Sequence, residues 1–131
     1  MGKRQRVLVI DDEEAICSFL RIFFEEEGYE VSTSLAAEDG VKAALKERPD
    51  IVFVDLNIPK MGGIEVLRQI KKSDENTVVV VITGFGTIEG ARSAMNLGAY
   101  DYITKPLDID FIKEVVTGAA SSARQKAAGN Q

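Results

Sequence analysis

The sequence contains no histidine and a single cysteine, and these shortages exclude several kinds of site. Without histidine, neither a histidine-based catalytic dyad nor a zinc site of cysteines and histidines can form. One cysteine cannot form an internal disulfide bond. We therefore expect Cys17 to be a small, buried or half-buried residue of a helix, with a redox role as the minor alternative.

Long apolar runs are also missing from the sequence. No stretch approaches the roughly 20 residues that a membrane-spanning helix needs. The apolar run after the opening MGKRQR is too short for a signal peptide. We therefore expect a cytoplasmic protein with no membrane partner. The formal net charge of -5 argues against direct binding of nucleic acid, because affinity for phosphate backbones comes mainly from basic patches.

Two kinds of segment alternate along the chain. Short apolar runs with strand character cover residues 6–10, 29–34, 51–55, 77–83 and 100–104. Between them, apolar residues recur at helical spacing from Ile16, from Ala37 and from Phe111, and shorter amphipathic segments cover 64–71 and 88–97. The 131 residues indicate one domain, residues 1–131, with a core of about residues 6–120. The C-terminal tail, 121–131, is poor in apolar residues and is expected to fray.

This alternation of strands and helices predicts an α/β fold. Each strand–helix–strand unit forms a right-handed crossover, so the five strands build a parallel sheet with helices on both faces. In a doubly wound sheet the strand order reverses once, and ligands bind in the crevice at that point, outside the carboxyl ends of the strands. The residues that follow each strand are therefore the candidates for function.

Several strands end in residues that a buried core does not need. The first strand is followed by DDEE, residues 11–14, and the third ends in Asp55. The fourth ends in Thr83, and the fifth leads into Lys105. Taken alone, each has a structural explanation: either aspartate of DDEE can cap the next helix, and Asp55 can form an Asx turn. Lys105 alone can be a solvated surface lysine.

Asp11, Asp12 and Asp55 together predict a metal site. Three carboxylates in one crevice repel one another and raise each other's pKa unless a cation joins them. A hard divalent ion, Mg²⁺ or Mn²⁺, suits carboxylate and carbonyl oxygens and keeps water sites that a phosphate can take. Lys105 can bind one phosphoryl oxygen and the Thr83 hydroxyl another. The set indicates a phosphoryl-transfer site in which an aspartate is the nucleophile.

Four motifs stand at these strand ends: VIDDEE, VDLNIPKMGG, VITGFG and DYITKP. In this order and at these positions they resemble the response-regulator receiver domains of bacterial two-component signalling, and the resemblance runs from Val7 to about Ala120. It implies a flavodoxin-like, doubly wound (βα)5 fold with a five-stranded parallel sheet in the order 2-1-3-4-5. The stretch from ITGFG to DYITKP is also similar to receivers of the nitrogen-regulation type.

The resemblance implies a role for each polar residue at the strand ends. Asp55 corresponds to the phosphoacceptor, and Asp11 and Asp12 correspond to the acid pair that holds Mg²⁺. The main-chain carbonyl of Asn57 corresponds to a further metal ligand, and Lys105 corresponds to the phosphate-binding lysine.

Further positions correspond to the family's switch and to its backbone geometry. Thr83 matches the switch hydroxyl and Tyr102 the switch aromatic ring. Pro106 matches a proline whose peptide bond with the preceding lysine is cis. Asn57 and Phe85 match positions that, in the family, border the route of the attacking water.

The function implied by the resemblance is a phosphorylation-dependent switch. The donor would be a histidine kinase or a phosphotransfer protein. The only chemistry of the chain itself would be Mg²⁺-dependent self-phosphorylation and self-dephosphorylation, so we expect no enzyme in the ordinary sense. The reader of the switch would be an effector domain or protein on the face formed by the fourth helix, the fifth strand and the last helix, or a second copy in a homodimer.

Two alternative functions remain open at this point. A phosphatase of the haloacid-dehalogenase type also uses an aspartyl phosphate, but its D-x-D-x-[TV] motif ends the first strand. Here the nucleophile would end the third strand, and Asn57 stands at the second aspartate's position. A phosphate-independent interaction module would usually lack part of the acidic pocket, which is complete here.

Overall fold

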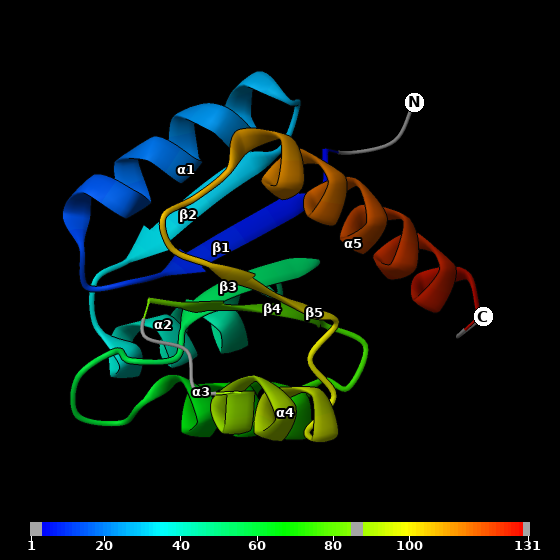
Figure 1. Ribbon diagram of the computed structural model, residues 1–131. Helices are drawn as coiled ribbons and strands as arrows, with labels where there is room; N and C mark the ends of the chain where they lie inside the picture. The colour runs from blue at the N-terminus through cyan, green and yellow to red at the C-terminus, as the bar shows by residue number, and fades with distance from the viewer. Residues whose placement is uncertain (1–3, 85–87, 130–131) are drawn as a thin grey trace.

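The computed structural model describes residues 4–84 and 88–129, in which five strands alternate with five helices (Figure 1). The strands are β1 Arg6–Ile10, β2 Glu30–Ser34, β3 Ile51–Asp55, β4 Val78–Thr83 and β5 Asp101–Thr104. The helices are α1 Glu14–Glu26, α2 Ala37–Glu47, α3 Gly63–Ser73, α4 Ile88–Asn96 and α5 Ile109–Gly129. Each strand lies within one residue of the range expected from the sequence, because its apolar run is bounded by turn residues.

All strand pairs in the sheet are parallel, and the order is β2-β1-β3-β4-β5. The structure therefore confirms the flavodoxin-like, doubly wound fold. The chain steps outward from β1 to β2 and then crosses to the other side of β1 to form β3. This reversal places the switch point between the carboxyl ends of β1 and β3, where a doubly wound sheet binds its ligands.

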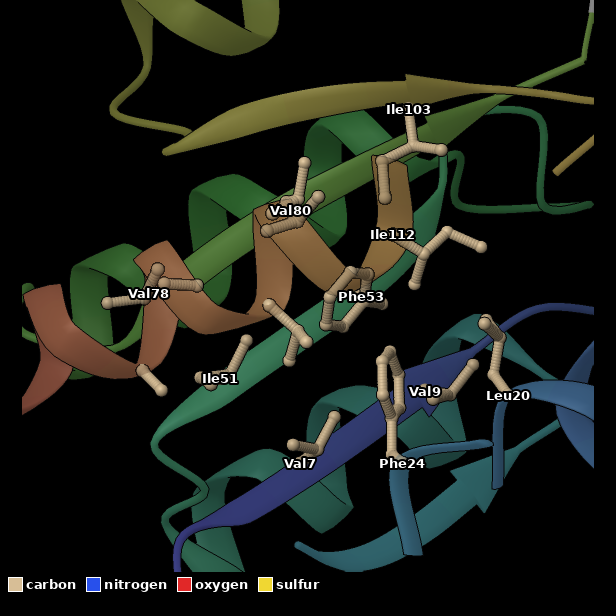
Figure 2. Close-up of a cluster of buried hydrophobic side chains, with 14 of the residues drawn as sticks. Val7, Val9, Leu20, Phe24, Ile51, Phe53, Val78, Val80, Ile103 and Ile112 are labelled. Carbon is tan, nitrogen blue, oxygen red and sulfur yellow. The ribbon is translucent and has the colours of Figure 1, made fainter. Parts of the chain in front are cut away.

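The two faces of the sheet carry separate hydrophobic cores. Successive side chains of a strand point to opposite faces, so Ile51 and Phe53 enter one core while Val52 and Val54 enter the other. The first core lies under α1 and α5, where the rings of Phe24 and Phe53 pack with a tilt of 35° and 4.9 Å between centroids (Figure 2). The second lies against α2, α3 and α4. β3 is thus buried on both faces, which fixes the position of its last residue.

The C-terminal helix differs from the sequence-based expectation. The expected fraying after residue 120 is wrong for residues 121–129, because α5 continues to Gly129. Ala123 is buried in the first core, and Arg124 donates a hydrogen bond of 2.9 Å to the side-chain oxygen of Gln5. The segment is rich in alanine, which is the strongest helix former and is small enough to pack closely. Its low content of large apolar residues is therefore compatible with an ordered helix.

Helix α4 is the least anchored helix of the described residues. Its one buried residue is Ala94, whereas each of the other helices buries three or more. In the part of the chain that the structure describes, none of the helices combines the length and the apolar content that crossing a bilayer would require.

Candidate functional site

The polar residues picked out in the sequence meet at the carboxyl edge of the sheet. β1 and β3 are neighbours with Ile10 beside Val54, so Asp11, which follows β1, lies beside Asp55, the last residue of β3. On the other side of β3, the Lys105 backbone N–H donates to the Thr83 carbonyl at 2.9 Å. This bond extends the pairing of β4 and β5 by one residue, and the lysine side chain reaches Asp55 at the end of β3.

Two of the three aspartates are buried and held by their own turns. The backbone N–H of Glu13 donates to Asp11 Oδ1 at 2.8 Å, and the backbone N–H of Asn57 donates to Asp55 Oδ1 at 2.9 Å. The Asx turn expected as one explanation of Asp55 is therefore present. Helix α1 begins after Glu13, not after an aspartate, and the described residues provide no side-chain cap for it. Asp12 is exposed at the mouth of the site.

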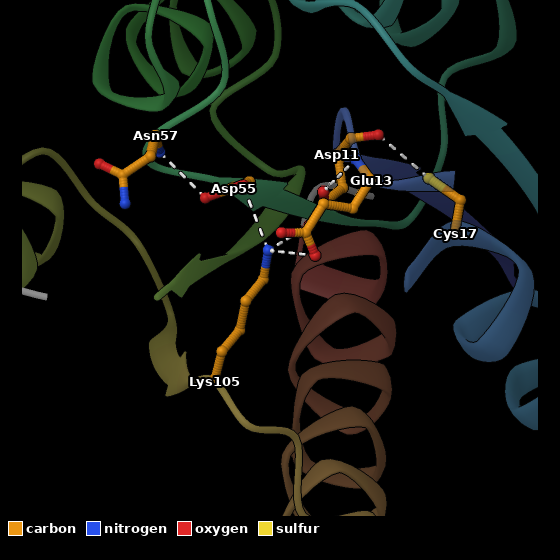
Figure 3. Close-up of polar contacts among 6 residues, drawn as sticks. All are labelled: Asp11, Glu13, Cys17, Asp55, Asn57 and Lys105. Atoms are coloured by element: carbon orange, nitrogen blue, oxygen red, sulfur yellow. Dashed lines mark hydrogen bonds and ion pairs between the residues drawn. The ribbon is translucent and has the colours of Figure 1, made fainter. Parts of the chain in front are cut away.

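Lys105 reaches into the site and bridges the carboxylates (Figure 3). Its Nζ lies 3.1 Å from Asp11 Oδ2, 3.3 Å from Asp55 Oδ2 and 3.4 Å from Glu13 Oε2. Burial would by itself lower the pKa of Lys105, but Asp11 and Asp55 outweigh that effect and the pKa is raised. The lysine is therefore charged at neutral pH and balances part of the acidic cluster.

The negative charge of Asp11 is only partly compensated by its surroundings. Burial raises its pKa above the usual value, and the nearby Asp55 carboxylate adds to the rise, while the Glu13 N–H and Lys105 offset it in part. Its Oδ2 atom is buried, and within the described residues the ion pair with Lys105 lacks hydrogen-bond geometry. A buried carboxylate oxygen without a hydrogen bond is costly, and a bound cation would satisfy it.

The aspartates fit a divalent metal ion. Asp11, Asp12 and Asp55 each offer a carboxylate oxygen, and these oxygens lie within 4.8 Å of one another. Three negative charges face one lysine, and hard divalent cations prefer oxygen ligands of this kind. The orphaned oxygen of Asp11 and the donor set together make this the candidate metal site of the structure.

The two candidate switch residues border a common cavity. Thr83 ends β4 and is 2% exposed, whereas Tyr102 on β5 is 43% exposed. A cavity of about 430 Å³ lies between β4, β5 and α4, lined by Thr83, Ile88, Ala91, Arg92, Met95, Tyr102 and Thr104. The cavity offers room for a side chain to move next to Thr83. Phe85, which was also picked out in the sequence, lies outside the described residues.

The loop after Asp55 is shaped by backbone geometry. Gly62 has a φ of +78°, which favours glycine, and Gly63 lies against the end of β3. A Cβ atom on Gly63 would lie 2.5 Å from the Asp55 carbonyl oxygen. Gly63 also donates a backbone hydrogen bond of 2.9 Å to the Leu56 carbonyl. On the opposite side of the site, the Lys105–Pro106 peptide bond is cis.

Glu13 is a member of the site that the sequence did not single out. Its carboxylate is one of the three partners of Lys105, yet its side chain is 57% exposed. The available signal was its place in the DDEE run directly after β1. An acidic residue in an exposed loop is common, so the run by itself did not separate Glu13 from Glu14.

The fold and the site define a class of protein: a doubly wound α/β domain with an acidic pocket and a lysine at the carboxyl edge of its sheet. Comparison with known families gives the particular one. The model of the response regulator receiver domain matches residues 7–117, and the chain belongs to this family. Its members are typically signalling modules of two-component systems and not enzymes.

Individual relatives show the same similarity. The chain is 36% identical over 112 residues to sporulation initiation phosphotransferase F of Bacillus subtilis, covering 86% of this chain and 90% of that protein. It is 30% identical over 114 residues to the regulatory protein AtoC of Escherichia coli, covering 87% of this chain but 25% of AtoC. The crystal structure of NtrX from Brucella abortus superposes with a TM-score of 0.90 at 32% identity, over 98% of this chain and 30% of NtrX.

Proposed function

We propose that this protein is a phosphorylation-dependent switch that accepts a phosphoryl group on Asp55. The donor is the phosphohistidine of a partner histidine kinase or phosphotransfer protein, and the reaction takes place in the cytoplasm, where receivers typically act. The observation that carries the proposal is the contact of Lys105 Nζ with both Asp11 and Asp55, at 3.1 and 3.3 Å, beside the cluster of three carboxylates.

In the transfer, a carboxylate oxygen of Asp55 forms the new P–O bond as the P–N bond to the donor histidine breaks. The bonding electron pair goes to the imidazole, which takes up a proton. Asp55 is suited to attack because its other oxygen is held by the Asn57 N–H and its carboxylate cannot rotate away. Lys105 is placed to bind a phosphoryl oxygen, as an ammonium group does in other phosphoryl-transfer sites.

Mg²⁺, or Mn²⁺ in its place, is the cofactor that we propose for the acidic cluster. Asp11, Asp12 and Asp55 would hold the ion together with the main-chain carbonyl of Asn57. When bound, the ion neutralises negative charge on the phosphoryl oxygens. The residues themselves supply the nucleophile and the fixed positive charge of Lys105.

We propose that the phosphorylated state is passed on through Thr83 and Tyr102. A phosphoryl group on Asp55 adds acceptor oxygens, and the Thr83 hydroxyl, at the end of the neighbouring strand, can turn to donate to one of them. Tyr102 then turns from its exposed position toward the cavity beside Thr83. This changes the face formed by α4, β5 and α5, which an effector domain, an effector protein or a second copy of the chain would read.

Membership in the receiver family and the intact pocket favour this function over the alternatives. A haloacid-dehalogenase-type phosphatase has its nucleophile after the first strand, whereas Asp55 ends the third strand. A phosphate-independent module would not need a half-buried Lys105 held between Asp11 and Asp55. The matched region spans a quarter of AtoC and under a third of NtrX, so the further activities of those longer proteins are not part of the proposal.

The direct test is chemical phosphorylation without a kinase. With Mg²⁺ and acetyl phosphate, wild type should gain one phosphoryl group per chain, because metal ligands, lysine and nucleophile are already in position. Intact-mass measurement follows the gain, and peptide mapping locates it. Asp55→Asn should gain none. An unchanged mass for wild type with fresh donor, or an equal gain in Asp55→Asn, would refute the proposal.

A further inference from the structure

Carboxylates surround the ammonium group of Lys105 before any phosphoryl group arrives. It has three N–H groups, and three carboxylate oxygens surround it: Asp11 Oδ2 at 3.1 Å, Asp55 Oδ2 at 3.3 Å and Glu13 Oε2 at 3.4 Å. A phosphoryl oxygen that binds Lys105 therefore competes with these carboxylates for the ammonium group.

Asp11 and Asp55 are poorly suited to release Lys105. Their side chains are 0% and 6% exposed, and each is tied to the backbone through its other oxygen. Release would leave a buried carboxylate without its counter-charge, which is among the costliest changes a site can undergo. Moving Lys105 away from Asp55 would also take it away from the atom that reacts.

Glu13 is suited to release it. Its side chain is 57% exposed, so its carboxylate can return to water, and ion pairs at exposed carboxylates are weak. Among the described residues, Lys105 is the ion-pair partner of the Glu13 carboxylate. The same carboxylate lies at the mouth of the site, where it repels an approaching dianion.

We propose that Glu13 is the exchangeable partner of Lys105 and that it limits phosphoryl entry from small anionic donors. This inference rests on the proposed function, because it concerns the phosphorylation of Asp55. Glu13 acts through Lys105 and is therefore a positioning residue: an incoming phosphoryl oxygen replaces its carboxylate on the lysine. Its carboxylate makes the site less accessible to free donors such as acetyl phosphate.

The test compares Glu13→Gln with Glu14→Gln. Both variants remove one negative charge from neighbouring positions, but Glu14 is an exposed residue of the first turn of α1, and the described residues include no contact between it and Lys105. At saturating Mg²⁺ and limiting acetyl phosphate, Glu13→Gln should be phosphorylated roughly five- to tenfold faster than wild type, because one charge near the entering dianion is gone. Glu14→Gln should stay within about twofold of wild type.

A binding measurement separates the lysine's release from changes in chemistry. Beryllofluoride, which mimics the phosphoryl group without a reaction, should bind Glu13→Gln with a dissociation constant lower by a similar factor, read from amide shifts of Gly84 and Lys105. A rate and an affinity for Glu13→Gln that match those of Glu14→Gln would overturn the inference alone. No phosphorylation of any of the three proteins would overturn the proposed function, and this inference with it.

Discussion

Thr83 is the first residue through which the proposed switch passes on phosphorylation of Asp55. It is 2% exposed and ends the strand next to Asp55, so its hydroxyl is close to the place where a phosphoryl group would be added. Tyr102 lies on the strand beyond it, across the cavity that both residues border. A change at Thr83 should therefore separate phosphorylation from its readout.

Thr83→Ala should accept a phosphoryl group on Asp55 yet fail to change the surface around Tyr102. The hydroxyl is needed to follow the phosphoryl group inward, whereas the nucleophile and Lys105 are unchanged. Hydrogen exchange in α4 and at Tyr102, with and without beryllofluoride, measures the response. A response in Thr83→Ala equal to that of wild type would contradict the coupling. Thr104→Ala, an exposed threonine on the rim of the same cavity, is the matched control.

The sequence predicted the residues of the site better than their contacts. Asp11, Asp55 and Lys105 could be found because each lies at the carboxyl end of a strand of a parallel sheet, and such strand ends converge at one edge. Glu13 could not, because its role depends on where a flexible, exposed side chain lies. The local sequence pattern does not determine where the Glu13 carboxylate lies. Its position follows from its ion pair with Lys105.

At the scale of elements, the approach of α3 to β3 determines the position of the phosphoacceptor loop. Gly63, the first residue of α3, is buried against the backbone of Asp55 and Leu56. A side chain at this position would meet two backbone atoms at 2.5 Å, and backbone atoms cannot move aside as a flexible side chain can. The helix and the loop would have to separate.

Gly63→Ala should lower the free energy of unfolding by about 1–3 kcal/mol. The loss should be near the upper end of this range, because the added methyl group would meet backbone atoms, which cannot move aside easily. The substitution should also slow phosphorylation of Asp55, since the loop that follows the nucleophile moves. Urea unfolding and the acetyl phosphate assay measure the two effects. Gly129→Ala, where a Cβ meets nothing within 4 Å, should stay near wild type in both. Equal behaviour of the two variants would show that α3 adjusts without cost.

The last turns of α5 bring Lys126 close to Lys71, near the end of α3. Lys71 donates hydrogen bonds to the carbonyls of Glu75 and Thr77 at 2.8 and 2.9 Å. The pKa of Lys71 is lowered to about 8, mainly by burial and in part by the Lys126 ammonium on α5, while Asp74 and Glu75 oppose the change. The pKa of Lys71 therefore reports whether α5 continues as far as Lys126.

Lys126→Gln should raise the pKa of Lys71 from about 8 toward its ordinary value of 10.5. A lysine pKa that falls on folding means that the unfolded chain binds the proton more tightly, so stability should rise with pH between these two values. The variant should reduce that rise. Titration of the Lys71 side chain by NMR tests the shift, with Lys72→Gln as the control on an exposed neighbour. An unchanged pKa in Lys126→Gln would place α5 away from Lys71.

For the molecule as a whole, the acidic cluster makes stability depend on a cation. Gathering Asp11, Asp12 and Asp55 costs free energy in the metal-free protein, and the unfolded chain does not hold them together. Ligands that bind only the folded state stabilise it by mass action. The negative charge that the site needs for its chemistry therefore also destabilises the metal-free protein.

Mg²⁺ should raise the free energy of unfolding by about 2.7 kcal/mol at one hundred times its dissociation constant. Thermal unfolding with Mg²⁺ or with EDTA measures the gain. Asp12→Ala should lose most of it while folding normally without metal, because Asp12 is exposed. If the midpoint of wild type does not move, the cluster is not a metal site.

The whole-molecule architecture followed from the sequence because the apolar runs alternate so regularly. Strand–helix alternation predicts parallel strands with helices on both faces, but the order of the strands came from resemblance to a family and not from the pattern. The end of α5 was missed for a physical reason: Ala123 is buried through helix packing, and small residues carry little signal in a count of apolar side chains.

Cys17 gives the molecule a practical property. It lies buried in the first core, its thiol donates to the Asp11 carbonyl at 3.3 Å, and burial raises its pKa, so it is a poor nucleophile. Because it is the single cysteine of the sequence, a cysteine introduced on the surface would be the one thiol that reacts readily with a maleimide dye. Fluorescent or spin labels could thus be attached at chosen positions on α4 while the native thiol is left in place, which would make movement of that helix directly visible.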